Sequence, residues 1–155
     1  MSHDSAKNLY FEDFEQGQDV VTAGRTLTEA DIVAFAGISG DHHPLHMDAE
    51  YARTTLFGER IAHGLLGLSI ATGLAARMGF MERTIEAFLG LEWKFRAPIK
   101  IGDTIHATMQ VAQTKAMGDA AGVVVFNVAI HNQRGEAVQR GQWTVLVKRR
   151  PQQAA

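Results

Sequence analysis

The chain has 155 residues, of which 46% are hydrophobic and 21% are charged, and its formal net charge is −2. This composition is that of an ordinary globular protein, so it excludes a disordered, collagen-like or coiled-coil chain, and the slightly acidic balance argues against nucleic acid as a partner. Because there is no cysteine, disulfides, thiolate catalysis and cysteine-ligated zinc are excluded too, and we expect a reducing compartment, the cytoplasm.

The length predicts a single domain over residues 1–155, with its core at about 8–148 and short polar tails. Met1 to Asn8 lack the apolar stretch of about 7–15 residues that a secretory signal requires. The longest uncharged segment, Gly64 to Ala76, has 13 residues and is shorter than the ~18 that a membrane span needs. We therefore expect no membrane as a partner.

Two short helices are expected in the first third of the chain. Thr28 is the expected N-cap of the first helix, which should end near Gly37 or Gly40. The second should begin after Asp48 and include Tyr51.

The segment between these helices, Ser39 to Asp48, holds three of the chain's 7 histidines and two carboxylates. Pro44 lacks an N–H and pushes His43 towards extended geometry. We therefore expect an ordered loop, in which Asp41 and His46 are not neighbours on a helix face. Loop residues that are held between rigid elements often carry function.

Three interpretations of this segment are open. In the first, Asp41 and Asp48 cap helices and the histidines lie on a surface turn. In the second, four histidines bind a metal ion, although their spacing matches no common zinc signature; they are His42, His43, His46 and His63. In the third, a carboxylate beside an imidazole activates water while the imidazole donates or accepts a proton.

The segment from Gly64 to Ala76 predicts a buried helix, because its apolar residues do not keep to one stripe. Gly64, Gly67 and Gly73 lower the helix propensity, by roughly 1 kcal/mol for each interior glycine. We expect this cost to be offset by close approach of a sheet or a ligand to the helix backbone.

After this helix the hydrophobic period changes from about 3.6 to 2, which predicts strands. The expected strands are Leu91 to Ala97, Thr104 to Val111, Val123 to Ile130 and Ala137 to Lys148, with a hairpin turn at Asn132 to Gly135. The third is apolar on nearly both faces, which is typical of a central strand, and the short loops favour antiparallel pairing. The expected fold class is α+β, one long buried helix packed on a curved antiparallel sheet.

Several of these residues together resemble a known family. The run Ser-Gly-Asp-x-x-Pro-x-His-x-Asp from Ser39 to Asp48, then Phe57, and then Ile61-Ala62-His63-Gly64-Leu65-Leu66 at the start of the apolar helix are similar to the MaoC-like dehydratases and R-specific enoyl-CoA hydratases. Further similarity lies in Tyr10 to Phe14 and in Phe95 to Thr104, so the resemblance covers most of the chain. It implies the hotdog fold, in which a sheet wraps a long central helix.

The resemblance also implies an activity, the addition or removal of water across the C2–C3 double bond of an enoyl-CoA thioester. Asp41 and His46 match the family's catalytic pair, which would hold the water between them, and Gly64 matches the glycine whose N–H lies in the oxyanion hole. An N–H at a helix N-terminus is suited to stabilising negative charge. No metal or other cofactor is implied, since coenzyme A is part of the substrate.

The resemblance further implies a homodimer or higher homo-oligomer, whose substrate tunnel lies between two copies. Four more residues are expected near the substrate: His43, His63, Ser69 and Thr72. His43 stands where the family commonly has asparagine, and Thr72 where R-specific hydratases often have serine. The hydroxyls of Ser69 and Thr72 could equally bond a carbonyl one turn back, and His63 could instead set the path of the chain into the helix.

Two other functions stay open. A hotdog acyl-CoA thioesterase would release free thiol, and the spacing of Asp41 and His46 argues against it. A non-catalytic acyl-CoA-binding subunit would keep the fold without the chemistry, and the presence of both residues argues against that.

Overall fold

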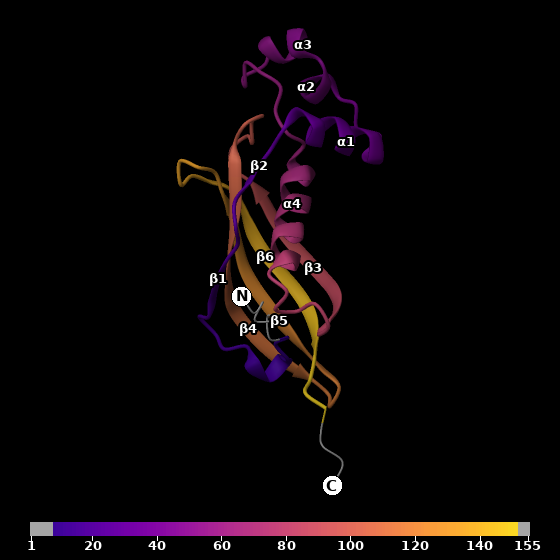
Figure 1. Ribbon diagram of the computed structural model, residues 1–155, viewed down its shortest axis with the longest axis vertical. Helices are drawn as coiled ribbons and strands as arrows, with labels where there is room; N and C mark the ends of the chain where they lie inside the picture. Colours follow the sequence, from indigo (N-terminus) through magenta and orange to yellow (C-terminus); the bar gives the residue numbers. More distant parts are fainter. Residues whose placement is uncertain (1–7, 152–155) are drawn as a thin grey trace, which may run out of the picture.

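The computed structural model describes residues 8–151, whose helices and strands are drawn in Figure 1. The prediction that Met1 to Asn8 carry no secretory signal therefore lies, apart from Asn8, outside the described residues. In chain order the elements are η1 (Phe11–Asp13), β1 (Asp19–Val21), β2 (Arg25–Thr26), α1 (Glu29–Ser39), α2 (Pro44–Met47), α3 (Ala49–Arg53), α4 (Gly64–Arg77), β3 (Ile85–Phe95), β4 (Thr104–Met117), β5 (Ala121–His131) and β6 (Ala137–Lys148).

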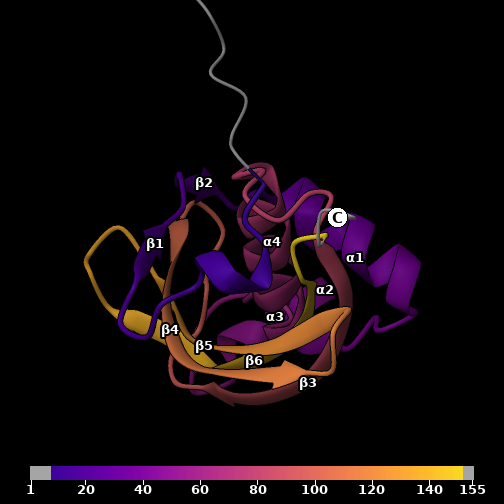
Figure 2. The ribbon, with the colours of Figure 1, turned by 90° about the horizontal axis from the view of Figure 1, so that it is seen from below.

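The strands form one antiparallel sheet in the order β1-β4-β5-β6-β3, and β2 also pairs with β4. Figure 2 shows the sheet curving around α4, which lies along its concave side. This is the α+β arrangement expected from the sequence, with one long helix wrapped by a curved sheet. The sequence did not predict β1 and β2, because pieces of 3 and 2 residues are too short to show a period of 2.

The predicted strands β4, β5 and β6 are present, and the turn before β6 has Gly135 at a φ of +76°. β5 pairs with β4 on one side and with β6 on the other, which confirms it as a central strand. β3 begins at Ile85, earlier than expected, and it is an edge strand of this sheet. On this strand Leu91 and Phe95 alternate with polar residues, yet they are 45% and 54% exposed.

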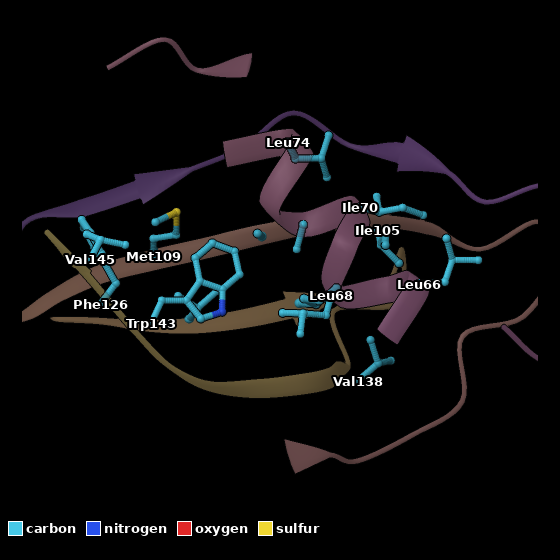
Figure 3. Packing of buried hydrophobic residues seen from close by; sticks show 14 of the residues in the cluster. Leu66, Leu68, Ile70, Leu74, Ile105, Met109, Phe126, Val138, Trp143 and Val145 are labelled. Carbon is cyan, nitrogen blue, oxygen red and sulfur yellow. The ribbon is translucent and has the colours of Figure 1, made fainter. Parts of the chain in front are cut away.

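The core lies between α4 and the concave face of the sheet. Figure 3 shows residues of α4 packed against residues of β4, β5 and β6; the labelled ones are Leu66, Leu68, Ile70, Leu74, Ile105, Met109, Phe126, Val138, Trp143 and Val145. Burial of aliphatic and aromatic side chains of this size contributes about 1.5–3 kcal/mol each. This packing fixes where α4 begins relative to the sheet.

One face of α4 differs from the expectation of a helix covered all round. Leu65, Ser69 and Gly73 are exposed, and residues four apart lie on the same helix face. The two earlier glycines do permit close approach: a Cβ at Gly64 would lie 2.7 Å from Cε1 of Phe95, and one at Gly67 would lie 2.6 Å from Nε2 of Gln139. A Cβ at Gly73 would meet no atom within 4 Å.

The three short helices α1, α2 and α3 gather at one end of the molecule, beyond the N-terminus of α4 (Figure 1). This places the histidine-rich segment beside the first turn of α4. Within residues 8–151, no helix is both long enough and apolar enough to cross a lipid bilayer.

Candidate active site

Asp41 is positioned by the end of α1. Gly40 ends this helix in the left-handed conformation, with a φ of +75°, and its N–H donates to the carbonyl of Ala36 (2.8 Å). The hydroxyl of Ser39 donates to the carbonyl of Phe35 (2.7 Å) and accepts from the N–H of Asp41 (3.1 Å). The exposed Asp41 carboxylate is thus held just beyond a fixed helix end.

The sequence predicted a loop at His46, but this residue lies in the one-turn helix α2. Pro44 is the first residue of α2, where a missing N–H has no cost and the fixed φ favours the helix. The N-cap is His43, whose Nδ1 accepts from the N–H of Leu45 (3.1 Å). Proline therefore starts the turn that carries His46, which places this imidazole towards α4.

Asp48 caps α3, as the first interpretation of the segment predicted. Its Oδ1 accepts from the N–H groups of Glu50 (2.9 Å) and Tyr51 (3.0 Å). Asp41 does not cap a helix: its Oδ1 accepts from the N–H of His43 (3.2 Å) across a turn. Asp41 therefore stays available for chemistry, whereas Asp48 has a structural role.

Asp41, His46 and His63 converge, with one potential ligand atom of each within 4.8 Å of the others. The rings of His46 and His63 are stacked, with their centroids 3.9 Å apart and an interplanar angle of 29°. Nδ1 of His46 lies 2.8 Å from the carbonyl oxygen of Ile61, and Nε2 of His63 lies 2.9 Å from that of Asp41. Since a carbonyl oxygen only accepts, both nitrogens carry hydrogens, and Nε2 of neutral His46 keeps a free lone pair.

The pKa of His46 is lower than 6.5, the ordinary value of a histidine side chain. Burial lowers this pKa most, the hydrogen bond to the Ile61 carbonyl raises it, the nearby His63 lowers it, and the Asp41 carboxylate raises it. His46 is thus a neutral imidazole near pH 7, ready to accept a proton at Nε2.

The same geometry bears on the metal interpretation. His42 and His43 are not part of the convergent group, which contains Asp41 in their place. Imidazole lone pairs lie in the ring plane, so two rings stacked at 29° direct them side by side and not towards one ion. A shared ion would require one ring to rotate and to leave its backbone carbonyl. The arrangement therefore favours acid–base chemistry over metal binding.

Gly64 is the first residue of α4, after the N-cap His63. The first N–H groups of a helix have no partner within it and lie at the positive end of its dipole. Gly64 and His46 line one cleft of about 600 Å³, together with Phe57, Phe95 and other residues. His46 and Gly64, for which the resemblance implies catalytic roles, thus line the same cleft.

None of the other four expected substrate contacts lines this cleft. Ser69 donates to the carbonyl of Leu65 (2.8 Å) and Thr72 to that of Ser69 (2.7 Å), as the alternative interpretation had it. Thr72 lines a separate cavity of about 280 Å³, whose other walls include Phe88 and Trp143. His63 is 3% exposed and lies beneath His46. Substrate contact by His43, His63, Ser69 and Thr72 stays a prediction.

The sequence reasoning missed Gln139, a buried residue that also lines the cleft. It is separated from the buried Trp143, Val145 and Val147 by even numbers of residues, so strand alternation places it on the inner face of β6. A polar residue at a position of inward parity is the signal that could have identified it.

The chain is similar to proteins of a known family. Residues 13–133 match the family model described as MaoC like domain. An (R)-specific enoyl-CoA hydratase from Rhodospirillum rubrum is 36% identical over 151 residues, 97% of this chain and 99% of that protein. A solved structure from Archaeoglobus, described as a monoamine oxidase regulatory protein, is 36% identical with a TM-score of 0.90 and covers 95% of this chain and 99% of its own.

A further relative is Protein MaoC from Klebsiella aerogenes, which is 46% identical over 101 residues, or 64% of this chain. The matched part spans only 30% of that protein. Its name therefore describes a longer protein than the matched segment. The fold shared with solved relatives is the hotdog fold that the sequence resemblance implied.

Proposed function

The chain belongs to the MaoC-like domain family, and from this premise we propose that it is a hydratase/dehydratase acting on 2-enoyl-CoA and 3-hydroxyacyl-CoA thioesters. The observation that carries the proposal is the shared cleft of His46 and Gly64, with Asp41 beside His46. One relative that aligns over nearly its whole length is named for the same chemistry.

In the hydration direction, water lies between the Asp41 carboxylate and Nε2 of His46. The lone pair of Nε2 takes one proton from the water while its oxygen bonds to C3, and the electron pair of the C2–C3 double bond moves towards the thioester carbonyl. The imidazolium of His46 then returns the proton to C2, so the net addition is one OH and one H. Asp41 orients the water and stabilises the transient imidazolium.

The carbonyl oxygen of the thioester gains negative charge in this step. We assign the stabilisation of this charge to the N–H of Gly64, because Gly64 is the first residue of α4 and lies at the positive end of the helix dipole. One such donor is worth about 2.7–4 kcal/mol of transition-state stabilisation. All groups of this mechanism are side chains and backbone of the chain, so we propose that the reaction needs no cofactor and that coenzyme A is part of the substrate. We also propose the cytoplasm as the location of the protein.

Hydration of crotonyl-CoA by the purified protein, followed by the loss of enoyl-thioester absorbance, tests the proposal. A panel of thioesters of different length and branching should accompany it. Release of free thiol without hydration would instead identify a thioesterase. Thermal stabilisation by acyl-CoA with no turnover would identify a non-catalytic binding subunit.

The pH dependence should report the neutral form of His46. Because the pKa of His46 is lowered, we expect kcat/KM to be constant near pH 7 and to fall on the acid side with a midpoint below 6.5. The folded state binds this proton more weakly than the unfolded chain, so stability also decreases as the pH falls from 6.5. The profile should be measured with Tm at each pH, and an acid midpoint above 6.5 with Tm unchanged would contradict this assignment.

We also infer that the active form is a homodimer or larger assembly joined through β3. β5, the central strand, is paired on both edges within the sheet and offers no free edge. β3 is an edge strand of 11 residues with Phe88, Leu89 and Leu91 about half exposed. An exposed apolar edge of this length is a template for another chain, and the cleft wall Phe95 lies on the same strand.

Light scattering should give at least twice the mass of the chain, and Leu91→Lys should shift it towards the monomer and lower activity. The reason is that a lysine on an edge strand would lose its hydrating water in a strand-to-strand contact, which is costly for a charged group. Val21→Lys is the matched control, because Val21 is 58% exposed on the opposite edge strand β1. A fully active monomer would refute the assembly.

A further inference from the structure

Gln139 is a polar residue of the cleft that the reaction does not explain. It lies on the inner face of β6, it is 3% exposed, and it lines the cleft with His46 and Gly64. A buried carboxamide is costly unless its donors and acceptor are bonded. Its partners are therefore informative about what it holds in place.

The carboxamide bridges β3 and the start of α4. Nε1 of Trp93 donates to Oε1 of Gln139 (2.9 Å), and Nε2 of Gln139 donates to the carbonyl of Gly64 (3.0 Å). An indole nitrogen only donates and a carbonyl only accepts, so the two partners fix which end of the carboxamide is oxygen and which is nitrogen. Trp93 thereby orients Gln139, and Gln139 holds Gly64.

Gly64 is a residue that needs such a restraint. It has no side chain to restrict its backbone torsions, and as the first residue of α4 it has an N–H without a partner inside the helix. The Phe95 ring occupies the space that a Cβ would need, because Cε1 of Phe95 lies 2.7 Å from the position of a Cβ at residue 64. The absent Cβ of Gly67, one turn later, leaves the room that Nε2 of Gln139 occupies.

We propose that Gln139 is a positioning residue for the reaction and that Trp93 acts through Gln139. By bonding the Gly64 carbonyl, Gln139 fixes the first residue of α4, so that the N–H of Gly64, on the preceding peptide unit, faces the thioester oxygen. This inference rests on the proposed hydratase function. It assigns a role to two residues of β6 and β3, Gln139 and Trp93, which lie far along the chain from the histidine-rich segment. It also explains the glycine at position 67, because a Cβ there would leave no room for the carboxamide of Gln139.

The test is Gln139→Met, which keeps the length of the side chain and removes both hydrogen-bonding groups. We expect kcat for crotonyl-CoA hydration to fall about 10-fold with KM changed less than about twofold, because a misaligned oxyanion donor is lost mainly in the transition state. The control is Gln142→Met. Gln142 lies on the same strand and also donates through its amide, to Asn127 (2.9 Å), but on the exposed face of the sheet.

Trp93→Phe provides a second variant that leaves Gln139 in place, and we expect about a threefold lower kcat. If Trp93 acts through Gln139, the double variant should be no slower than Gln139→Met alone, so the two effects should not add. Additive effects would overturn the role of Trp93. A folded Gln139→Met protein with wild-type kcat would overturn the proposal for Gln139. If Gln139→Met does not fold, wild-type kcat in Trp93→Phe would overturn it instead.

Failure of this inference can be told from failure of the proposed function. If the wild-type protein hydrates no enoyl-CoA, the proposed function fails. If the wild-type protein is active and the variants match it, only the role of Gln139 fails.

Discussion

Replacing His46 by glutamine should lower kcat for enoyl-CoA hydration by about 10²–10⁴-fold, the usual contribution of a general acid–base group. Glutamine can still approach the Ile61 carbonyl through its amide, but it offers no lone pair that takes a proton from water. The variant should stay folded, because His46 is only partly buried and lies in a one-turn helix. Steady-state kinetics on crotonyl-CoA, with Tm by differential scanning fluorimetry, check both parts.

Asp41→Asn should produce a loss of similar size. Asparagine keeps an oxygen that can accept from the N–H of His43, so the turn can be retained while the charge beside His46 is removed. Because Asp41 and His46 act on one water, the double variant should be little slower than either single variant. His42→Gln is the control: His42 is exposed and lies outside the convergent group, so kcat should stay within about threefold of wild type. Wild-type turnover by folded His46→Gln or Asp41→Asn would reject the acid–base pair.

The candidate site could be predicted from the sequence because its residues lie in two short segments. Asp41 and His46 are five residues apart, and His63 and Gly64 are consecutive, so a motif captures them. Their stacking is not local: the His46 and His63 rings meet only because α2 folds back onto the start of α4. The sequence treated Pro44 as a residue that prevents a helix, whereas its position as first residue of α2 makes it a helix start.

The contacts that escaped prediction join residues far apart in the chain. Gln139 bonds Gly64 across 75 positions of sequence, and the pairing of β1 with β4 depends on strands about 90 residues apart. Alternation reports which face of a strand is buried, but not whether an edge has a neighbour. The alternation of Leu91 and Phe95 with polar residues therefore could not show that both are half exposed on the edge strand β3.

Gly64→Pro should lower kcat by about 10²–10³-fold beyond Gly64→Ala, because it deletes the N–H of the oxyanion hole and little else of the helix. Proline is favoured at the first position of a helix, and the preceding His63 has a φ of −54° and a ψ of 136°, which suits a residue before proline. Alanine keeps the N–H, so comparison of the two variants isolates the donor.

Both variants introduce a Cβ that meets the Phe95 ring, and this shared cost has to be removed from the comparison. Phe95 is 54% exposed and only its ring edge lies close, so Phe95→Leu should relieve the contact. In that background Gly64→Ala should regain most of its activity, whereas Gly64→Pro should not, since the missing hydrogen is unaffected by the space around Cβ. A folded Gly64→Pro protein that matches Gly64→Ala in kcat would place the oxyanion donor elsewhere than at the first N–H of α4, and it would remove the proposed role of Gln139 in positioning Gly64.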